Sequence, residues 1–141
     1  MFVYIAGPLS QSTGRKFIEK IDALCKQLNL ETFLPHRDVG LVEFTSDIPK
    51  AFQEDVKALN RCDLVIASFN HWRIGAGTSW ELGYAYAKGK KIMGIKTDAP
   101  REMWIPDLSA MILGSMYICT SLHELEQKLL EIKKASALDP A

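Results

Sequence analysis

Short apolar runs alternate along the chain with longer segments in which apolar residues recur every three or four positions. The short runs are typical of buried strands, and the longer segments predict amphipathic helices. We expect strands at residues 3–6, 31–34, 64–67, 91–95 and 116–118. We expect helices at about residues 17–28, 48–60 and 78–88 and from residue 121 onward, with a loop over residues 36–47.

Strands that alternate with helices predict an α/β fold, with about five parallel strands and helices on both faces. We assign residues 1–135 to a single domain and residues 136–141 to a frayed C-terminal tail. Ligands of such sheets bind beyond the carboxyl ends of the strands, near the topological switch point. That rule nominates the segments 7–10, 35–38 and 69–77 as the candidate ligand edge.

Composition narrows the class of partner and the compartment. The 17 basic side chains balance 17 acidic ones, which argues against a nucleic-acid polymer or an anionic membrane as the main partner. No apolar run reaches the roughly 18–20 residues that span a bilayer, and the first residues do not resemble a leader. Three widely spaced cysteines (Cys25, Cys62 and Cys119) are typical of small reduced core residues, so we expect a cytoplasmic protein.

Glu81 is the first candidate for chemistry. It follows the glycines Gly75 and Gly77 at the start of a predicted helix, where the backbone N–H groups favour a carboxylate. One interpretation is a surface residue that complements the helix dipole. The other is a carboxylate in a ligand site, because Trp80 and Leu82 flank it and glycines let a ligand approach the backbone.

Asp55 and Tyr4 are the second and third candidates. Asp55 lies at the edge of an apolar helix stripe, so its carboxylate either reaches solvent at the rim or is partly desolvated with a raised pKa. Tyr4 lies within the first strand, where a buried phenol either only packs or also finds a partner for its hydroxyl. Two carboxylates and a phenol at one ligand edge are a set suited to glycosyl transfer.

Three segments carry a resemblance to a known family: Val3-Tyr4-Ile5-Ala6-Gly7-Pro8-Leu9, Phe33-Leu34-Pro35-His36-Arg37-Asp38, and the run from Gly77 to Lys90 that contains Trp80-Glu81-Leu82-Gly83-Tyr84. With Asp55 eight residues ahead of Asp63, they resemble the nucleoside 2-deoxyribosyltransferases. The resemblance implies a flavodoxin-like (Rossmann-like) sheet and a two-step retaining mechanism without cofactor or metal. Glu81 would be the nucleophile, Asp55 would protonate the departing base, and Tyr4 would hold the nucleophile.

Two positions depart from the transferase pattern. Many transferases carry an Asp where this chain has Gly75, and an Asn where it has Ser109, in Ser109-Ala110-Met111-Ile112. Ser109 resembles the sister group, the 2′-deoxynucleoside 5′-monophosphate N-glycosidases, in which a serine contacts the 5′-phosphate. Pro8 instead resembles the transferases. We therefore place the transferase first and the monophosphate N-glycosidase second, with a non-catalytic nucleotide-sensing module as a third alternative.

The resemblance also suggests further substrate contacts and an assembly. Gly7 and Pro8 would shape the loop under the sugar, while His36 and Asp38 would touch the base. Trp72 and Trp104 either wall the base pocket or only pack. The family assembles as dimers or larger oligomers with shared sites, so Ser109 and Met111 would reach the site of a neighbouring subunit. The expected partners are nucleosides, nucleotides or free bases.

Overall fold

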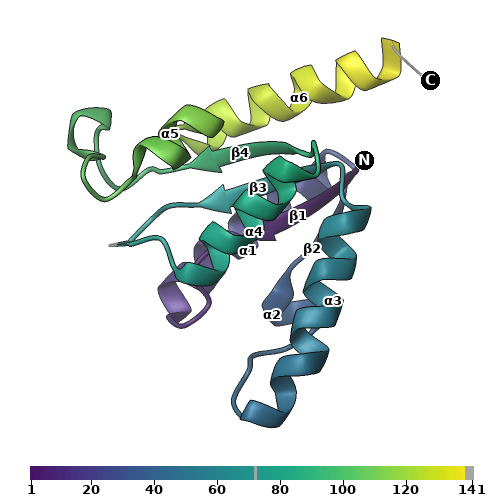
Figure 1. The fold of residues 1–141 in the computed structure, drawn as a ribbon. Coiled ribbons are helices and arrows are strands. Elements are labelled where there is room, and N and C mark those ends of the chain that lie inside the picture. Colours follow the sequence, from purple (N-terminus) through teal and green to yellow (C-terminus); the bar gives the residue numbers. More distant parts are fainter. Residues whose placement is uncertain (72, 139–141) are drawn as a thin grey trace.

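The computed structural model describes residues 1–71 and 73–138, so Trp72 and residues 139–141 lie outside the described part (Figure 1). The strands are β1 (Phe2–Ala6), β2 (Glu31–Phe33), β3 (Leu64–Ser68), β4 (Lys91–Ile95) and β5 (Tyr117–Cys119). The helices are α1 (Ser12–Gln27), α2 (Pro35–Asp38), α3 (Ile48–Arg61), α4 (Ala76–Ala87), α5 (Ala110–Ser115) and α6 (Leu122–Leu138). All the strands pair in parallel, in the order β2-β1-β3-β4-β5, which confirms the predicted α/β sheet.

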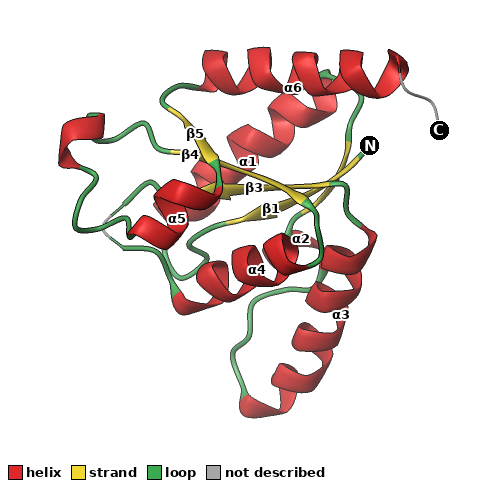
Figure 2. Cartoon of the chain, turned by 45° about the horizontal axis from the view of Figure 1, so that its top comes forward, coloured by secondary structure: helices red, strands yellow, loops and turns green. Residues whose placement is uncertain are grey.

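The side chains of β1 divide between two cores. Val3 and Ile5 pack with residues of α1 and α6, whereas Tyr4 and Ala6 pack with residues of α3 and α4. Alternate residues of a strand point to opposite faces, so this division follows directly from the strand period. Figure 2 shows α1 and α6 on one side of the sheet and α3 and α4 on the other. Tyr4 therefore faces the helices that carry Asp55 and Glu81.

Several element boundaries differ from the prediction. The segment predicted as a loop over residues 36–47 contains α2 and a 3-10 turn at Thr45–Asp47. The helix α2 begins with Pro35, and Asp38 accepts a hydrogen bond from the Leu34 N–H at 2.9 Å, which stabilises this single turn. The strand β5 begins and ends one residue later than expected, and α6 continues to Leu138, into the segment expected to be frayed.

The N-terminal half of α3 extends past the edge of the sheet, together with the segment that leads into it (Figure 1). Phe44, Ile48 and Phe52 in this region are more than half exposed, at 68%, 52% and 55%. The apolar stripe of α3 that the sequence predicts is therefore covered by the sheet only over its second half, at Ala58 and Leu59.

Two further features bear on the composition argument. None of the helices in the described residues is long and apolar enough to cross a membrane. The three cysteine thiols are buried and unbridged, as expected from their apolar neighbours.

The contact between β4 and the end of β3 yields a test of this packing. A Cβ atom on Gly94 would lie 2.3 Å from Cε2 of Phe69, so the ring must move if any side chain is added. We expect Gly94→Ala to lower the free energy of unfolding by about 1–3 kcal/mol, measured by urea denaturation. In a Phe69→Leu background, Gly94→Ala should cost less stability than in the parent, because leucine lacks the ring atoms that the added Cβ would meet. Equal losses in the two backgrounds would show that this contact is not the cause.

Candidate active site

Three elements bring the predicted catalytic set together. Tyr4 lies in the middle of β1 and is fully buried, with its ring stacked on Phe33 at 5.2 Å between centroids. Asp55 comes from α3 and Glu81 from α4, the two helices over that face of the sheet. The negative charges of Glu81 and Asp55 both act on the Tyr4 hydroxyl, which places the three groups in one electrostatic environment.

Each of these side chains has a buried polar atom without a hydrogen-bond partner among the described residues. The atoms are the Tyr4 hydroxyl oxygen, Oδ1 of Asp55 and Oε2 of Glu81. Buried polar groups are almost always paired in proteins, and leaving one unpaired destabilises the fold. Three such atoms at one place indicate a site whose partners come from a bound molecule.

The protonation of the set follows from its burial. Burial, assisted by the charge of Asp55, raises the pKa of Glu81 to about 7, although the Tyr4 hydroxyl acts in the opposite direction. Burial and the charge of neighbouring Glu54 raise the pKa of Asp55 to about 6. Burial and the two carboxylates raise the pKa of Tyr4, so its hydroxyl stays protonated and can donate a hydrogen bond. Near neutral pH this site can hold one ionised and one protonated carboxyl group.

The interpretation of Glu81 as a dipole-complementing surface residue is wrong. The helix α4 begins at Ala76, two residues before the predicted start, and has no acidic residue in its first turn. Gly75 is the residue that precedes the helix, with an extended backbone. Glu81 therefore lies beyond the first turn, outside the reach of the unpaired N–H groups.

Two cavities meet at Asp55. The first, of about 420 Å³, is lined by Asp55, Glu81 and Gly77 and by the aromatic rings of Phe52 and Trp80, among others. A Cβ atom on Gly77 would lie 3.9 Å from Oε1 of Glu81, so the glycine leaves the carboxylate open on that side. The second cavity, of about 400 Å³, shares Asp55 and is lined mainly by residues 9–15 and 35–43.

Gly7 and Pro8 shape the turn between β1 and α1. A Cβ atom on Gly7 would lie 2.8 Å from Cδ1 of Ile18 and 3.2 Å from Cβ of Ser68, so a larger residue would displace the Ile18 side chain. Pro8 packs equally closely on Gly14, whose added Cβ atom would lie 2.7 Å from the Pro8 carbonyl oxygen. Both residues act on the site through this turn, and neither lines the two cavities that meet at Asp55.

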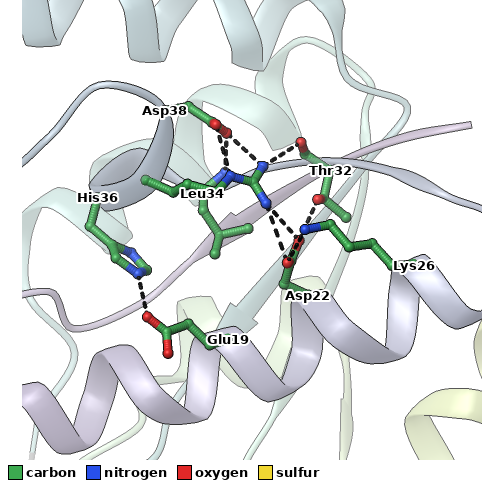
Figure 3. A network of polar contacts seen from close by, with 8 residues as sticks. Glu19, Asp22, Lys26, Thr32, Leu34, His36 and Asp38 are labelled. Atoms are coloured by element: carbon green, nitrogen blue, oxygen red, sulfur yellow. Dashed lines mark hydrogen bonds and ion pairs between the residues drawn. The ribbon is translucent and has the colours of Figure 1, made fainter.

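His36 and Asp38 belong to a polar network on α1, drawn in Figure 3. His36 Nε2 lies 3.2 Å from Oε1 of Glu19, and the Asp38 carboxylate pairs with Arg37 at 2.8 Å. Arg37 also bridges to Asp22, which lies inside the network. The hydrogen bonds from Arg37 hold the pKa of Asp38 below its usual value. His36 therefore contacts α1, Asp38 pairs with Arg37 within α2, and neither of these predicted base contacts lines either cavity.

Ser109 and Met111 lie on another side of α4. They line a groove of about 480 Å³ with Ser79 and Tyr86, and this groove does not include Glu81. Met111 is 81% exposed. Trp104, a candidate wall of the base pocket, is buried in the core, and its indole N–H donates to the Ala99 carbonyl at 2.9 Å.

A polar cluster that the sequence did not reveal holds the connection from β3 to α4. The Lys96 ammonium is buried and donates to the Phe69 carbonyl at 2.9 Å and to Asp98 at 2.7 Å. Asn70 exchanges hydrogen bonds with Thr97 at 2.7 and 2.9 Å. These bonds fix the segment that precedes α4 and so help to position Glu81. The sequence feature that could have revealed this cluster is a lysine, Lys96, directly after the apolar strand β4.

The sequence also did not reveal two charged residues that line the second cavity, Arg15 and Glu43. Both lie outside the segments that the strand-end rule nominates. Among the described residues, no three His, Cys, Asp or Glu side chains lie close enough together to hold a metal ion.

Comparison with known proteins identifies the family. The family model for nucleoside 2-deoxyribosyltransferases matches residues 3–128, which is most of the chain. The chain belongs to this family. No protein with a curated description matches it.

Solved structures similar to this nucleoside 2-deoxyribosyltransferase-family chain show the same fold. A 2-deoxyribosyltransferase from Bacillus psychrosaccharolyticus has a TM-score of 0.77 and 22% identity, over 89% of this chain and 90% of that one. A conserved protein from Enterococcus faecalis has a TM-score of 0.72 and 17% identity, over 93% and 98%. A Clostridium botulinum CMP N-glycosidase has a TM-score of 0.62 and 23% identity, over 92% and 98%.

The raised pKa of Glu81 predicts how stability depends on pH. In the unfolded chain this carboxyl group ionises near 4.5, whereas in the folded protein it ionises near 7. The folded state therefore holds a proton that the unfolded state has lost, and stability falls as pH rises through this window. We expect Glu81→Gln to gain up to about 3 kcal/mol of stability relative to the parent between pH 4.5 and pH 8.

Denaturant unfolding at pH 4.5 and pH 8 measures this effect. Glu102→Gln, at an exposed position, is the matched control and should follow the parent at both pH values. A stability difference between Glu81→Gln and the parent that does not change with pH would contradict the burial of the carboxylate.

Proposed function

We propose that this chain is a nucleoside 2-deoxyribosyltransferase that cleaves the N-glycosidic bond of 2′-deoxynucleosides and passes the deoxyribose to another nucleobase. The observation that carries the proposal is the convergence of Tyr4, Asp55 and Glu81, each with a buried, unpaired oxygen atom, beside the cavity that Asp55 and Glu81 line. A nucleotide-sensing module has no need of a nucleophile and an acid with pKa values near neutrality.

The proposed reaction has two steps. In the first, the Glu81 carboxylate attacks C1′, the bond from C1′ to the base nitrogen breaks, and Asp55 gives a proton to the departing base. The pKa of Glu81, about 7, lies above that of Asp55, about 6, so this step requires that the proton lies on Asp55 and not on Glu81 when the substrate is bound. In the second, a nitrogen of the incoming base attacks C1′, the bond to Glu81 breaks, and the displaced N–H proton goes to Asp55. The protonated Tyr4 hydroxyl acts on the pKa of Glu81 and orients its carboxylate once substrate is bound. Neither step requires a cofactor or a metal.

A 5′-monophosphate N-glycosidase is the second candidate, with water in place of the incoming base. The observation that favours it is Gly75, which leaves no carboxylate at the residue before α4. An aspartate there would repel a phosphate dianion. The two candidates share the first chemical step and differ in the phosphate and in the acceptor.

We further propose a cytoplasmic homodimer or larger homo-oligomer in which subunits complete each other's sites. Ser109 and Met111 line a groove that does not include the Glu81 of the same chain, so we expect them to contribute across an interface. The exposed side chains at that groove, Tyr86 at 63% and Met111 at 81%, are suited to burial against a second copy.

The first experiment is a chromatographic assay with a panel of 2′-deoxynucleosides and a matching panel of 5′-monophosphates, each with and without a second free base. A new deoxynucleoside that forms only with the acceptor present is the expected result for the transferase. If the monophosphates instead yield free base and deoxyribose 5-phosphate whether or not the acceptor is present, the protein is the hydrolase and not the transferase. Binding of nucleotides without any turnover would replace both with the sensor.

Variants of the three proposed catalytic residues complete this test. Glu81→Ala should abolish turnover while the circular dichroism spectrum stays unchanged, because the nucleophile is lost. Asp55→Asn should lower the rate by about two to four orders of magnitude, because the leaving base is no longer protonated. Tyr4→Phe should have a milder effect. Unchanged turnover of Glu81→Ala would sink the nucleophile assignment.

A complementation experiment tests the shared site. Glu81→Gln and Ser109→Ala subunits, each with low activity alone, are unfolded together, refolded as a mixture and assayed. If Ser109 serves a neighbouring site, mixed dimers contain one intact site and the mixture regains activity. The same mixture of Glu81→Gln and Asp55→Asn, both from one subunit's site, is the control and should stay inactive. No gain over the separate variants would place Ser109 outside the shared site.

A further inference from the structure

The second cavity lies where the chemistry of the proposed function needs a leaving-group site. It is bounded by the segment after β1, with Leu9 and Ser10, by α2 and its following residues, and by Asp55 of α3. Asp55, the proposed acid, lines both this cavity and the one that contains Glu81. A substrate cleaved between these two carboxyl groups would place its sugar beside Glu81 and its base on the far side of Asp55.

Two side chains of opposite charge line this second cavity, in addition to Asp55. Arg15 is held in place because its Nη1 donates to the carbonyl oxygen of Leu9, and its other N–H groups remain available. Glu43 also lines the cavity and belongs to the segment that follows α2. Within the described residues neither Arg15 nor Glu43 forms an ion pair, with each other or with Asp55.

The rest of the lining suits a flat ring. Pro35, Val39, Leu41 and Val42 supply apolar surface. A base ring packs on such surface, while its edge needs hydrogen-bond partners when it leaves water. An arginine only donates hydrogen bonds and an ionised glutamate only accepts them, so the pair fits an edge that presents both an acceptor and a donor.

We propose that this cavity is the nucleobase subsite and that Arg15 and Glu43 select bases that carry a carbonyl oxygen and an exocyclic amine. Arg15 donates to the carbonyl oxygen and Glu43 accepts from the amine. Cytosine and guanine meet both requirements; thymine, uracil and hypoxanthine lack the amine, and adenine lacks the carbonyl. The inference rests on the proposed function, because that function is what makes Asp55 the group beside the base.

A phosphate in this cavity is the competing occupant, and the charges argue against it. Glu43 and Asp55 line the same space as Arg15, so a dianion would face two carboxyl groups and a single cation. A neutral base meets no such repulsion. A hydrogen bond to a charged partner also discriminates strongly, because a base that lacks the matching group leaves a desolvated charge unpaired.

The test compares Glu43→Gln with the parent on deoxycytidine and thymidine, with and without a 5′-phosphate. Glutamine can donate as well as accept, so we expect the preference for cytosine in kcat/KM to fall about 10- to 100-fold. Glu102→Gln, an exposed glutamate elsewhere, should leave the preference unchanged. Arg15→Lys retains the positive charge and loses the planar fork, so turnover of both cytosine substrates should fall.

Calorimetric binding of free cytosine and free thymine to the parent and to Glu43→Gln separates this inference from the proposed function. Turnover with an unchanged base preference in Glu43→Gln would overturn the inference and leave the function standing. Selective binding of cytosine that Glu43→Gln abolishes, without any turnover, would support the subsite and remove the transferase. A loss in Arg15→Lys that is confined to 5′-monophosphates and equal for all bases would make the cavity an anion site. If the parent shows neither turnover nor base binding, the inference and the proposed function are both overturned.

Discussion

The burial of the Glu81 carboxylate between β1, α3 and α4 is the constraint on which the site depends. A carboxyl group removed from water loses hydration, and here that loss raises the pKa of Glu81 to about 7 and leaves Oε2 without a partner. The fold tolerates this because the surrounding core is closely packed and β1 presents Tyr4 to the same face. The site is thus a place where stability is given up for reactivity.

The remainder of the ligand edge holds that arrangement rigid. Arg37, Asp22 and Asp38 fix α2 against α1, and Lys96 with Asp98 fixes the segment between β3 and α4. These ion pairs lie at the carboxyl ends of the strands, around the site and outside its cavities. Their charges are satisfied within the protein, whereas the polar atoms of the proposed catalytic set are not. This contrast separates Arg37, Asp38 and Lys96, which support the site, from Tyr4, Asp55 and Glu81.

Family membership and geometry support different parts of the functional argument. The family model and the shared fold establish a nucleoside 2-deoxyribosyltransferase-like protein, with both a transferase and an N-glycosidase among its structural neighbours. In the proposed mechanism the transferase and the N-glycosidase share the first bond cleavage, so one arrangement of carboxyl groups would serve either activity. The second cavity, which we propose for the leaving base, is lined largely by loop residues, and loops vary more than the sheet that carries them.

The sequence by itself determined the order of strands and helices and the parallel sheet. It also nominated Tyr4, Asp55 and Glu81 as the candidate catalytic residues. Apolar runs and helical stripes are local patterns, and the period of β1 puts Tyr4 on one face whatever follows it. Only the tertiary structure decided which charged residues face a ligand. His36 and Asp38 both follow a strand, yet His36 contacts Glu19 of α1 and Asp38 pairs with its neighbour Arg37. Arg15 and Glu43 come from segments far apart in the chain and line one cavity. Side-chain partners depend on how the helices pack on the sheet, and no local sequence pattern encodes which distant residues that packing brings together.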